Sequence, residues 1–122
     1  MSPLRVFDTR PGTADGLRAV PKVKVGGANV LEVSVVGVGG VPVSGVGAVS
    51  LNVTATEPGA AGFVTVFPCG ARELVSSLNY VSGQTVGNSV IAPVSASGEV
   101  CFFSSASTHL VVDIDGWFSS SG

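Results

Sequence analysis

The stretch from Ala48 to Thr56 constrains the fold more than any other part of the chain. It reads Ala-Val-Ser-Leu-Asn-Val-Thr-Ala-Thr, so apolar and polar side chains alternate without a break from Val49 to Thr56. Successive side chains of a β-strand point to opposite faces of its sheet. This period of two therefore predicts a strand with one face buried and the other face in solvent.

Similar extended segments recur along the chain, and glycine and proline separate them. The seventeen glycines and seven prolines are typical of many short strands joined by turns, and no segment requires a helix. Two pairs of consecutive segments flank short turns and are predicted to form β-hairpins: 46–56 with 62–67, and 85–94 with 99–104. The full set of predicted strands is 4–7, 22–25, 30–36, 46–56, 62–67, 75–80, 85–94, 99–104 and 108–118.

This pattern predicts one all-β domain over residues 1–122, with a core at about 4–118 and a linker-like tail at 119–122. Eight to nine short strands favour an antiparallel two-layer β-sandwich of jelly-roll type. An immunoglobulin-like sandwich is the alternative. The cysteine–tryptophan–cysteine order of antibody domains is absent, which makes that alternative weaker.

Charge and composition exclude several classes of function. Only 11% of the residues are charged and the net charge is −2, with six scattered basic residues. No basic stripe could follow a phosphate backbone, so nucleic acid is not expected as a partner. No apolar run reaches the 18 or so residues of a membrane span. One histidine and few carboxylates favour a module without catalysis or cofactor.

Two cysteines, Cys69 and Cys101, are predicted to form a disulfide; two free buried thiols are the alternative. A zinc site would need four ligands, more than the histidine and cysteine content supplies. A bridge closing 32 residues is worth about 3–4 kcal/mol and indicates an oxidising compartment. The first residues hold no signal peptide. We therefore expect either a cytoplasmic protein or a segment of a longer secreted chain.

The last predicted strand carries Asp113 and Asp115 two residues apart. Strict alternation places both on one face with Trp117, and places Leu110, Val112, Ile114 and Phe118 on the other. The two carboxylates can bind a hard cation such as Ca²⁺, act as a catalytic pair in a hydrolase, or form ion pairs with Arg5 or Arg10. We favour the ion pairs, which would tie the amino-terminal segment to the last strand.

Polar and aromatic side chains near the predicted strands suggest a ligand site. Asparagine is disfavoured in strands, so Asn79 is a candidate hydrogen-bonding residue. Tyr80 or Trp117 would supply a platform on which a sugar ring stacks. His109 is interpreted as a surface residue that could join such a site. The other two asparagines in or beside predicted strands are Asn52 and Asn88.

Five motifs occur in order and together resemble a known kind of module. They are Arg-Val-Phe-Asp-Thr-Arg at 5–10, Leu-Asn-Val-Thr-Ala-Thr at 51–56, Gly-Phe-Val-Thr-Val-Phe-Pro at 62–68, Ser-Leu-Asn-Tyr at 77–80 with Gly-Gln-Thr at 83–85, and His-Leu-Val-Val-Asp-Ile-Asp-Gly-Trp-Phe at 109–118. The set resembles the β-rich repeat module of secreted or surface proteins of actinobacteria, where it occurs singly or in tandem beside hydrolase, protease or FG-GAP-type regions.

The resemblance implies a secreted or cell-surface accessory module with no catalytic activity. Our leading hypothesis for such a module is surface attachment or carbohydrate recognition. A structural building block is the alternative function. Low charge and abundant valine favour association with identical subunits, and a closed trimer is one assembly that a jelly roll would allow. A hydrolase using Asp113 and Asp115 is the remote alternative.

Overall fold

The computed structural model describes residues 2–27, 29–70 and 76–120, which contain eight β-strands and no helix. No helix in these ranges is long and apolar enough to cross a membrane. The strands are β1 (Leu4–Asp8), β2 (Val30–Ser34), β3 (Val46–Thr56), β4 (Gly62–Pro68), β5 (Leu78–Tyr80), β6 (Val86–Pro93), β7 (Glu99–Ser104) and β8 (His109–Ser119).

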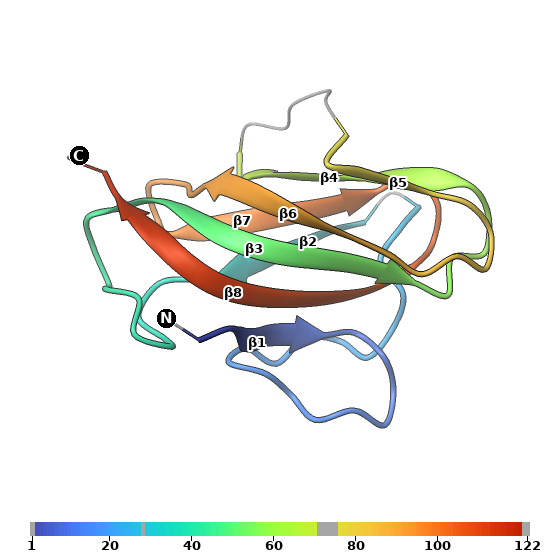
Figure 1. Cartoon of the computed structure of the whole chain (residues 1–122), viewed down its shortest axis with the longest axis horizontal. Helices are drawn as coiled ribbons and strands as arrows, with labels where there is room; N and C mark the ends of the chain where they lie inside the picture. The colour runs from blue at the N-terminus through green and yellow to red at the C-terminus, as the bar shows by residue number, and fades with distance from the viewer. Residues whose placement is uncertain (1, 28, 71–75, 121–122) are drawn as a thin grey trace.

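The strands form two antiparallel sheets of four strands each. The first sheet has the order β1-β8-β3-β6, and the second sheet has the order β2-β7-β4-β5. In Figure 1, β8 and β3 run side by side through the first sheet, as their ladder of paired residues requires. The all-β class and the two-layer arrangement are therefore confirmed.

The strand pairing is that of a jelly roll. The first strand pairs with the last, β2 with β7, β3 with β6, and β4 with β5. Four antiparallel ribbons of this kind result when one long hairpin wraps around itself. The pairs β3–β8 and β4–β7 then join the ribbons into two sheets.

Both predicted hairpins are wrong, because their strands lie in different sheets. The chain crosses from β3 in the first sheet to β4 in the second, and from β6 back to β7 in the second. In a jelly roll only β4 and β5 are both consecutive and paired. The short turns at 57–61 and 94–98 therefore connect the two layers instead of closing a ribbon.

Two of the predicted strands also differ from the structure. In the segment 22–25 only Val25 pairs, through a single bridge to Thr108. The side chain of Lys22 donates to the backbone carbonyl of Asp8 at 2.7 Å, which ties this segment to the end of β1. In the segment 75–80, strand β5 begins at Leu78, and residue 75 lies outside the described residues.

The core fills the space between the inner faces of the two sheets. The alternation that predicted β3 is confirmed, because the four apolar residues on its predicted inner face are at most 1% exposed: Val49, Leu51, Val53 and Ala55. Across the sandwich, the ring of Phe7 from β1 meets that of Phe102 from β7 edge to face, with centroids 5.1 Å apart. Valine provides most of the remaining core, which is the composition that tightly facing β-sheets favour.

A bulge in β8 changes which side chains face outward near its end. Leu51 pairs with Ile114 and Ser50 with Gly116, so Asp115 has no partner of its own in β3. An extra residue in one strand exchanges the inner and outer faces for the side chains that follow it. The predicted faces are therefore wrong after Ile114: Trp117 lies opposite the core residue Val49, and Phe118 lies opposite Ala48 on the outer face.

Arg18 closes the side of the sandwich where β1 and β2 form the edges of their sheets. Its backbone N–H donates to the carbonyl of Val6 in β1. Its guanidinium donates to the carbonyls of Ser34 and Val36 at 2.9 and 3.0 Å. One residue therefore satisfies backbone groups at the edges of both layers.

The predicted disulfide is present between Cys69, just after β4, and Cys101 in β7, with Cα atoms 5.0 Å apart. It crosslinks two neighbouring strands of the second sheet.

We expect Arg18→Lys to lower the free energy of unfolding by about 1–2 kcal/mol, because one ammonium cannot reproduce the planar pair of hydrogen bonds to two carbonyls. Urea unfolding measures this change. The matched control is Lys24→Gln at an exposed position, which should alter stability by less than about 0.5 kcal/mol. Equal stability of the wild type and Arg18→Lys would contradict the role assigned to this side chain.

Candidate functional site

The densest group of charges lies at the amino-terminal motif, residues 5–10. Its side chains form ion pairs that hold the structure together. The carboxylate of Asp8 is 1% exposed. Arg10 donates to its two oxygens at 2.7 and 3.0 Å, and Arg5 approaches at 3.3 Å. These hydrogen bonds, chiefly that from the Arg10 side chain, lower the pKa of Asp8 from 3.8 to about 2 despite the opposing effect of burial. Asp8 is therefore held ionised, so it is unsuited to accept a proton near neutral pH.

Arg5 also forms an ion pair with Asp113 on β8, so it ties β1 to the last strand as the sequence suggested. Arg10 does not take part in that link. Of the two arginines offered as partners, Arg5 forms the pair, because the chain turns after β1 and places the Arg10 guanidinium against Asp8, two residues earlier. One of the two candidate metal or catalytic carboxylates is thus already engaged by a cation.

Asp115 lies apart from that pair, exposed at the bulge of β8. Among the described residues, one group brings together at least three potential metal ligands. It consists of Glu32, Cys69 and Cys101 and includes neither aspartate. A cation bound by Asp113 and Asp115 would also have to compete with the Arg5 guanidinium.

His109 is buried, in contrast to the surface position predicted for it. Its side chain is 8% exposed, and its Nδ1 lies 3.0 Å from the hydroxyl of Thr9. Burial lowers the pKa of His109, which favours the neutral ring. The hydroxyl of Thr9 also accepts the N–H of Leu110 at 2.9 Å. His109 thus helps to join the chain after β1 to β8 and is shielded from an external ligand.

Tyr80 is likewise a core residue, so its ring cannot serve as a surface platform. It is 3% exposed. Its hydroxyl lies 2.6 Å from that of Ser104, donates to the carbonyl of Ala106 at 2.9 Å and accepts the N–H of Ala106 at 3.2 Å. A buried tyrosine usually finds such partners for its hydroxyl. Here they fix the turn between β7 and β8 to β5.

Asn79 points out of the second sheet and lies directly opposite Phe63 in the β4–β5 ladder. Phe63 is 38% exposed, and its ring centroid is 6.1 Å from that of Phe103. An exposed amide and a partly exposed aromatic pair therefore share one outer face. We call Phe63, Phe103 and Asn79 the aromatic face; of these three residues, only Asn79 was expected from the sequence to bind ligand.

The other two strand asparagines have separate positions. Asn88 on β6 donates from its side-chain amide to the carbonyl of Ser77 at 2.8 Å, which links the two layers. Asn52 lies opposite Asp113 on the outer face of the first sheet. Neither lies beside Asn79 in a strand ladder.

Trp117 is 38% exposed and belongs to the first sheet. Its neighbour Phe118 is 50% exposed, and Ile91 of β6 is 58% exposed. Phe118 and Pro93 flank Ala48 on either side of β3, and Ile91 lies opposite Ser50. We call Phe118, Ala48, Pro93 and Ile91 the apolar patch.

A shallow hollow of about 230 Å³ lies between the segment after Val20 and the start of β2. Its walls are mainly apolar, with polar atoms from Thr9, Lys24 and Asn29. None of the residues predicted to bind ligand lines it.

Comparison with known proteins returned no match: no family model, no curated protein and no solved structure corresponds to this chain.

We expect Asp8→Asn to lower the free energy of unfolding at pH 7 by about 2 kcal/mol, the equivalent of the pKa shift. Because the folded state holds this carboxyl at a pKa of about 2 instead of 3.8, its contribution is complete above about pH 4. It is lost as the pH falls towards 2. The variant should therefore lack this part of the acid-induced loss of stability, measured by urea unfolding between pH 7 and pH 2.

Asp15→Asn is the control, since Asp15 is 57% exposed and 3.6 Å from Lys22; its effect should stay below about 1 kcal/mol. A wild-type pH profile that Asp8→Asn leaves unchanged would contradict the proposed coupling.

Proposed function

We propose that this chain is a non-catalytic, secreted or cell-surface accessory module that recognises carbohydrate through the aromatic face of its second sheet. The observation that carries the proposal is the juxtaposition of the partly exposed Phe63 ring with the exposed Asn79 amide. The resemblance to the actinobacterial secreted module supports the non-catalytic and secreted part of this proposal.

The chemistry of a saccharide suits this pair. The C–H groups on one face of a pyranose ring are apolar and stack on an aromatic ring, while the hydroxyls at its edge hydrogen-bond to an amide. Phe103 braces the ring of Phe63, which lowers the conformational entropy lost on binding. The side chain of Asn79 offers both a donor and an acceptor.

Several charged residues are engaged in structural ion pairs and hydrogen bonds, which supports a binding role over catalysis. Asp8 is neutralised by two arginines, Asp113 is paired with Arg5, and Arg18 is bound to backbone carbonyls. Catalytic carboxylates are commonly tuned towards neutral pKa values, whereas that of Asp8 is moved away from them. The disulfide supports secretion, because such bonds persist in oxidising compartments.

We expect a glycan array to show binding by the wild type that Phe63→Ala weakens at least ten-fold, because the stacking surface is removed. Trp117→Ala is the matched control: it removes an aromatic ring of the same 38% exposure from the other sheet and should bind normally. Binding lost in Trp117→Ala but kept in Phe63→Ala would move the site to the first sheet and contradict the proposal. So would the absence of any glycan ligand.

Self-association is the second candidate function, and the apolar patch favours it. The bulge in β8 turns Phe118 outward beside Ala48, so apolar side chains of three neighbouring strands lie together in solvent. Contiguous exposed apolar surface commonly marks an interaction site. A patch on one face of a jelly roll can be shared by identical subunits around a symmetry axis, with a closed trimer among the allowed assemblies.

We expect the double variant Phe118→Ser, Ile91→Ser to be monomeric under conditions in which the wild type forms a stable oligomer. Size-exclusion chromatography with light scattering measures the mass. Val43→Ser is the control, because Val43 is 80% exposed but lies outside the patch. A monomeric wild type at every concentration would exclude this second function.

A further inference from the structure

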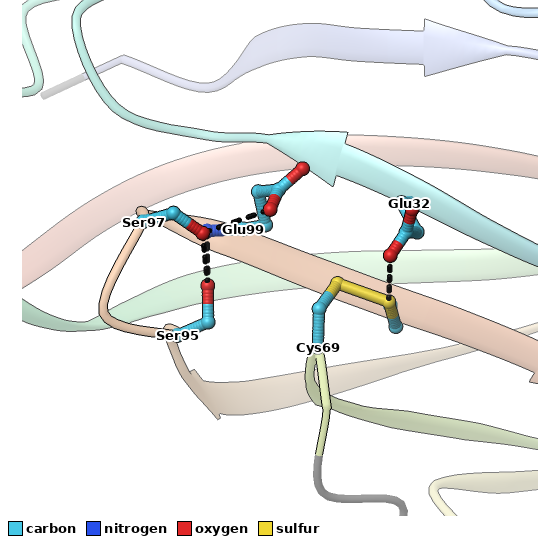
Figure 2. Close-up of a disulfide and its surroundings, with 6 residues drawn as sticks. Glu32, Cys69, Ser95, Ser97 and Glu99 are labelled. Carbon is cyan, nitrogen blue, oxygen red and sulfur yellow. Dashed lines mark hydrogen bonds between the residues drawn. A yellow bond between two sulfur atoms is a disulfide. The ribbon is translucent and has the colours of Figure 1, made fainter.

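The Cys69–Cys101 disulfide has a carboxylate beside it, although a disulfide bond does not require one. Glu32 of β2 is directly opposite Cys101 of β7 in the ladder. Its Oε1 lies 3.9 Å from the Sγ of Cys101, and Figure 2 shows the carboxylate directed at the bridge. The two sulfurs and this oxygen all lie within 4.8 Å of one another.

The oxidised bridge offers Glu32 no favourable partner. A disulfide sulfur has no proton to donate, so this contact contributes no ordinary hydrogen bond. Within residues 2–27, 29–70 and 76–120, Glu32 also forms no ion pair. The carboxylate is exposed and free to change partner when the sulfurs change their chemical state.

We propose that reduction of the Cys69–Cys101 disulfide creates a binding site for a zinc-class divalent cation. The thiolates of Cys69 and Cys101 and the carboxylate of Glu32 are its ligands, and the fourth position is left to water or to an external ligand. Sulfur and carboxylate ligands with one open position form a recognised type of zinc coordination.

The chemistry balances in two steps. A dithiol reductant gives two electrons and two protons to the S–S bond, so that the protein gains two thiols and the reductant becomes a disulfide. The cation then displaces the two thiol protons into solvent and bonds to both sulfurs and to Glu32.

The distances suit such a site. Zinc–sulfur bonds of about 2.3 Å and zinc–oxygen bonds of about 2.1 Å, at tetrahedral angles, place sulfur and oxygen about 3.6 Å apart and the two sulfurs about 3.8 Å apart. The observed Glu32–Cys101 separation of 3.9 Å already matches the first value closely. The second requires the sulfurs to move apart. Rotation about χ1 of Cys69, which lies beyond the end of β4, would supply this movement.

The inference does not depend on carbohydrate recognition, because neither Phe63 nor Asn79 is a ligand. Counting cysteine and histidine excluded a site with four such ligands, but the third ligand is a glutamate distant in sequence that the β2–β7 register brings to the sulfurs.

The test is a cadmium titration of the reduced protein. The wild type is reduced with dithiothreitol, separated from it under anaerobic conditions and titrated with Cd²⁺, whose thiolate complexes absorb in the ultraviolet. We expect this absorption to saturate at one Cd²⁺ per chain in the reduced protein and to be absent in the oxidised protein. No saturable signal from the reduced protein would overturn the proposal.

Two variants test the ligand set. Cys69→Ser should abolish the 1:1 complex, and Glu32→Gln should weaken binding at least ten-fold. Glu99→Gln is the matched control, because Glu99 is two residues from Cys101 on the same strand but accepts a hydrogen bond from Ser97 at 2.8 Å (Figure 2). Equal affinity of Glu32→Gln and Glu99→Gln would overturn the assignment of Glu32.

Stability provides a readout that remains valid if reduction unfolds the chain. A cation that binds the folded state raises its melting temperature. Zn²⁺ should therefore raise that of the reduced wild type, or restore the circular dichroism of the folded state if reduction removes it. It should leave the oxidised protein unchanged. Failure of Zn²⁺ to do either in the reduced protein would contradict the site.

Discussion

The pairing of β3 with β8 is the interaction on which the rest of this structure depends. These are the longest strands, each of 11 residues, and they occupy the centre of the first sheet. Each carries a row of fully buried apolar side chains on its inner face. The second sheet can pack only where that face is continuous, since the hydrophobic effect scales with the apolar area removed from water. The single bulge in β8 marks where the continuity ends and where apolar side chains begin to face solvent.

Three of the few charged residues of this chain connect its strands and turns. Arg5 connects β1 to β8, Arg10 secures the turn beyond β1, and Arg18 closes the edge between β1 and β2. All three lie on the side of the sandwich where β1 is an edge strand with only one neighbouring strand. Arginine suits this position because its planar group donates several hydrogen bonds at once.

Much of the architecture could be predicted from the sequence because it depends on local pattern. Alternation in 46–56 identified the inner face of β3, and the number of short strands indicated the jelly roll. Strand partners were harder, since in this topology the residues of β3 pair with residues 31 to 73 positions further along the chain and not with the next strand. Proximity in sequence therefore misled the hairpin predictions.

The candidate site was less predictable, because residue type does not reveal burial. Tyr80 and His109 are polar enough to suggest a surface position, yet hydroxyl and backbone partners from distant segments allow both to be buried. Conversely, nothing in the sequence singled out Phe63 as an exposed aromatic residue. Its exposure beside Asn79 follows from the register of β4 with β5, and such a register has no signature in one sequence.

The jelly-roll wrap also determines how the module would respond to mechanical tension. Leu4 pairs with Ile114 near the end of β8. A pull on the two chain ends would therefore break the hydrogen bonds of the β1–β8 ladder one after another, in the unzipping geometry. Peeling could not extend the 32-residue segment enclosed by the sulfur crosslink. Because that segment cannot extend, the stretched chain would be shorter by about 110 Å of contour length. Its inner strands β4 and β7 would remain linked by the disulfide.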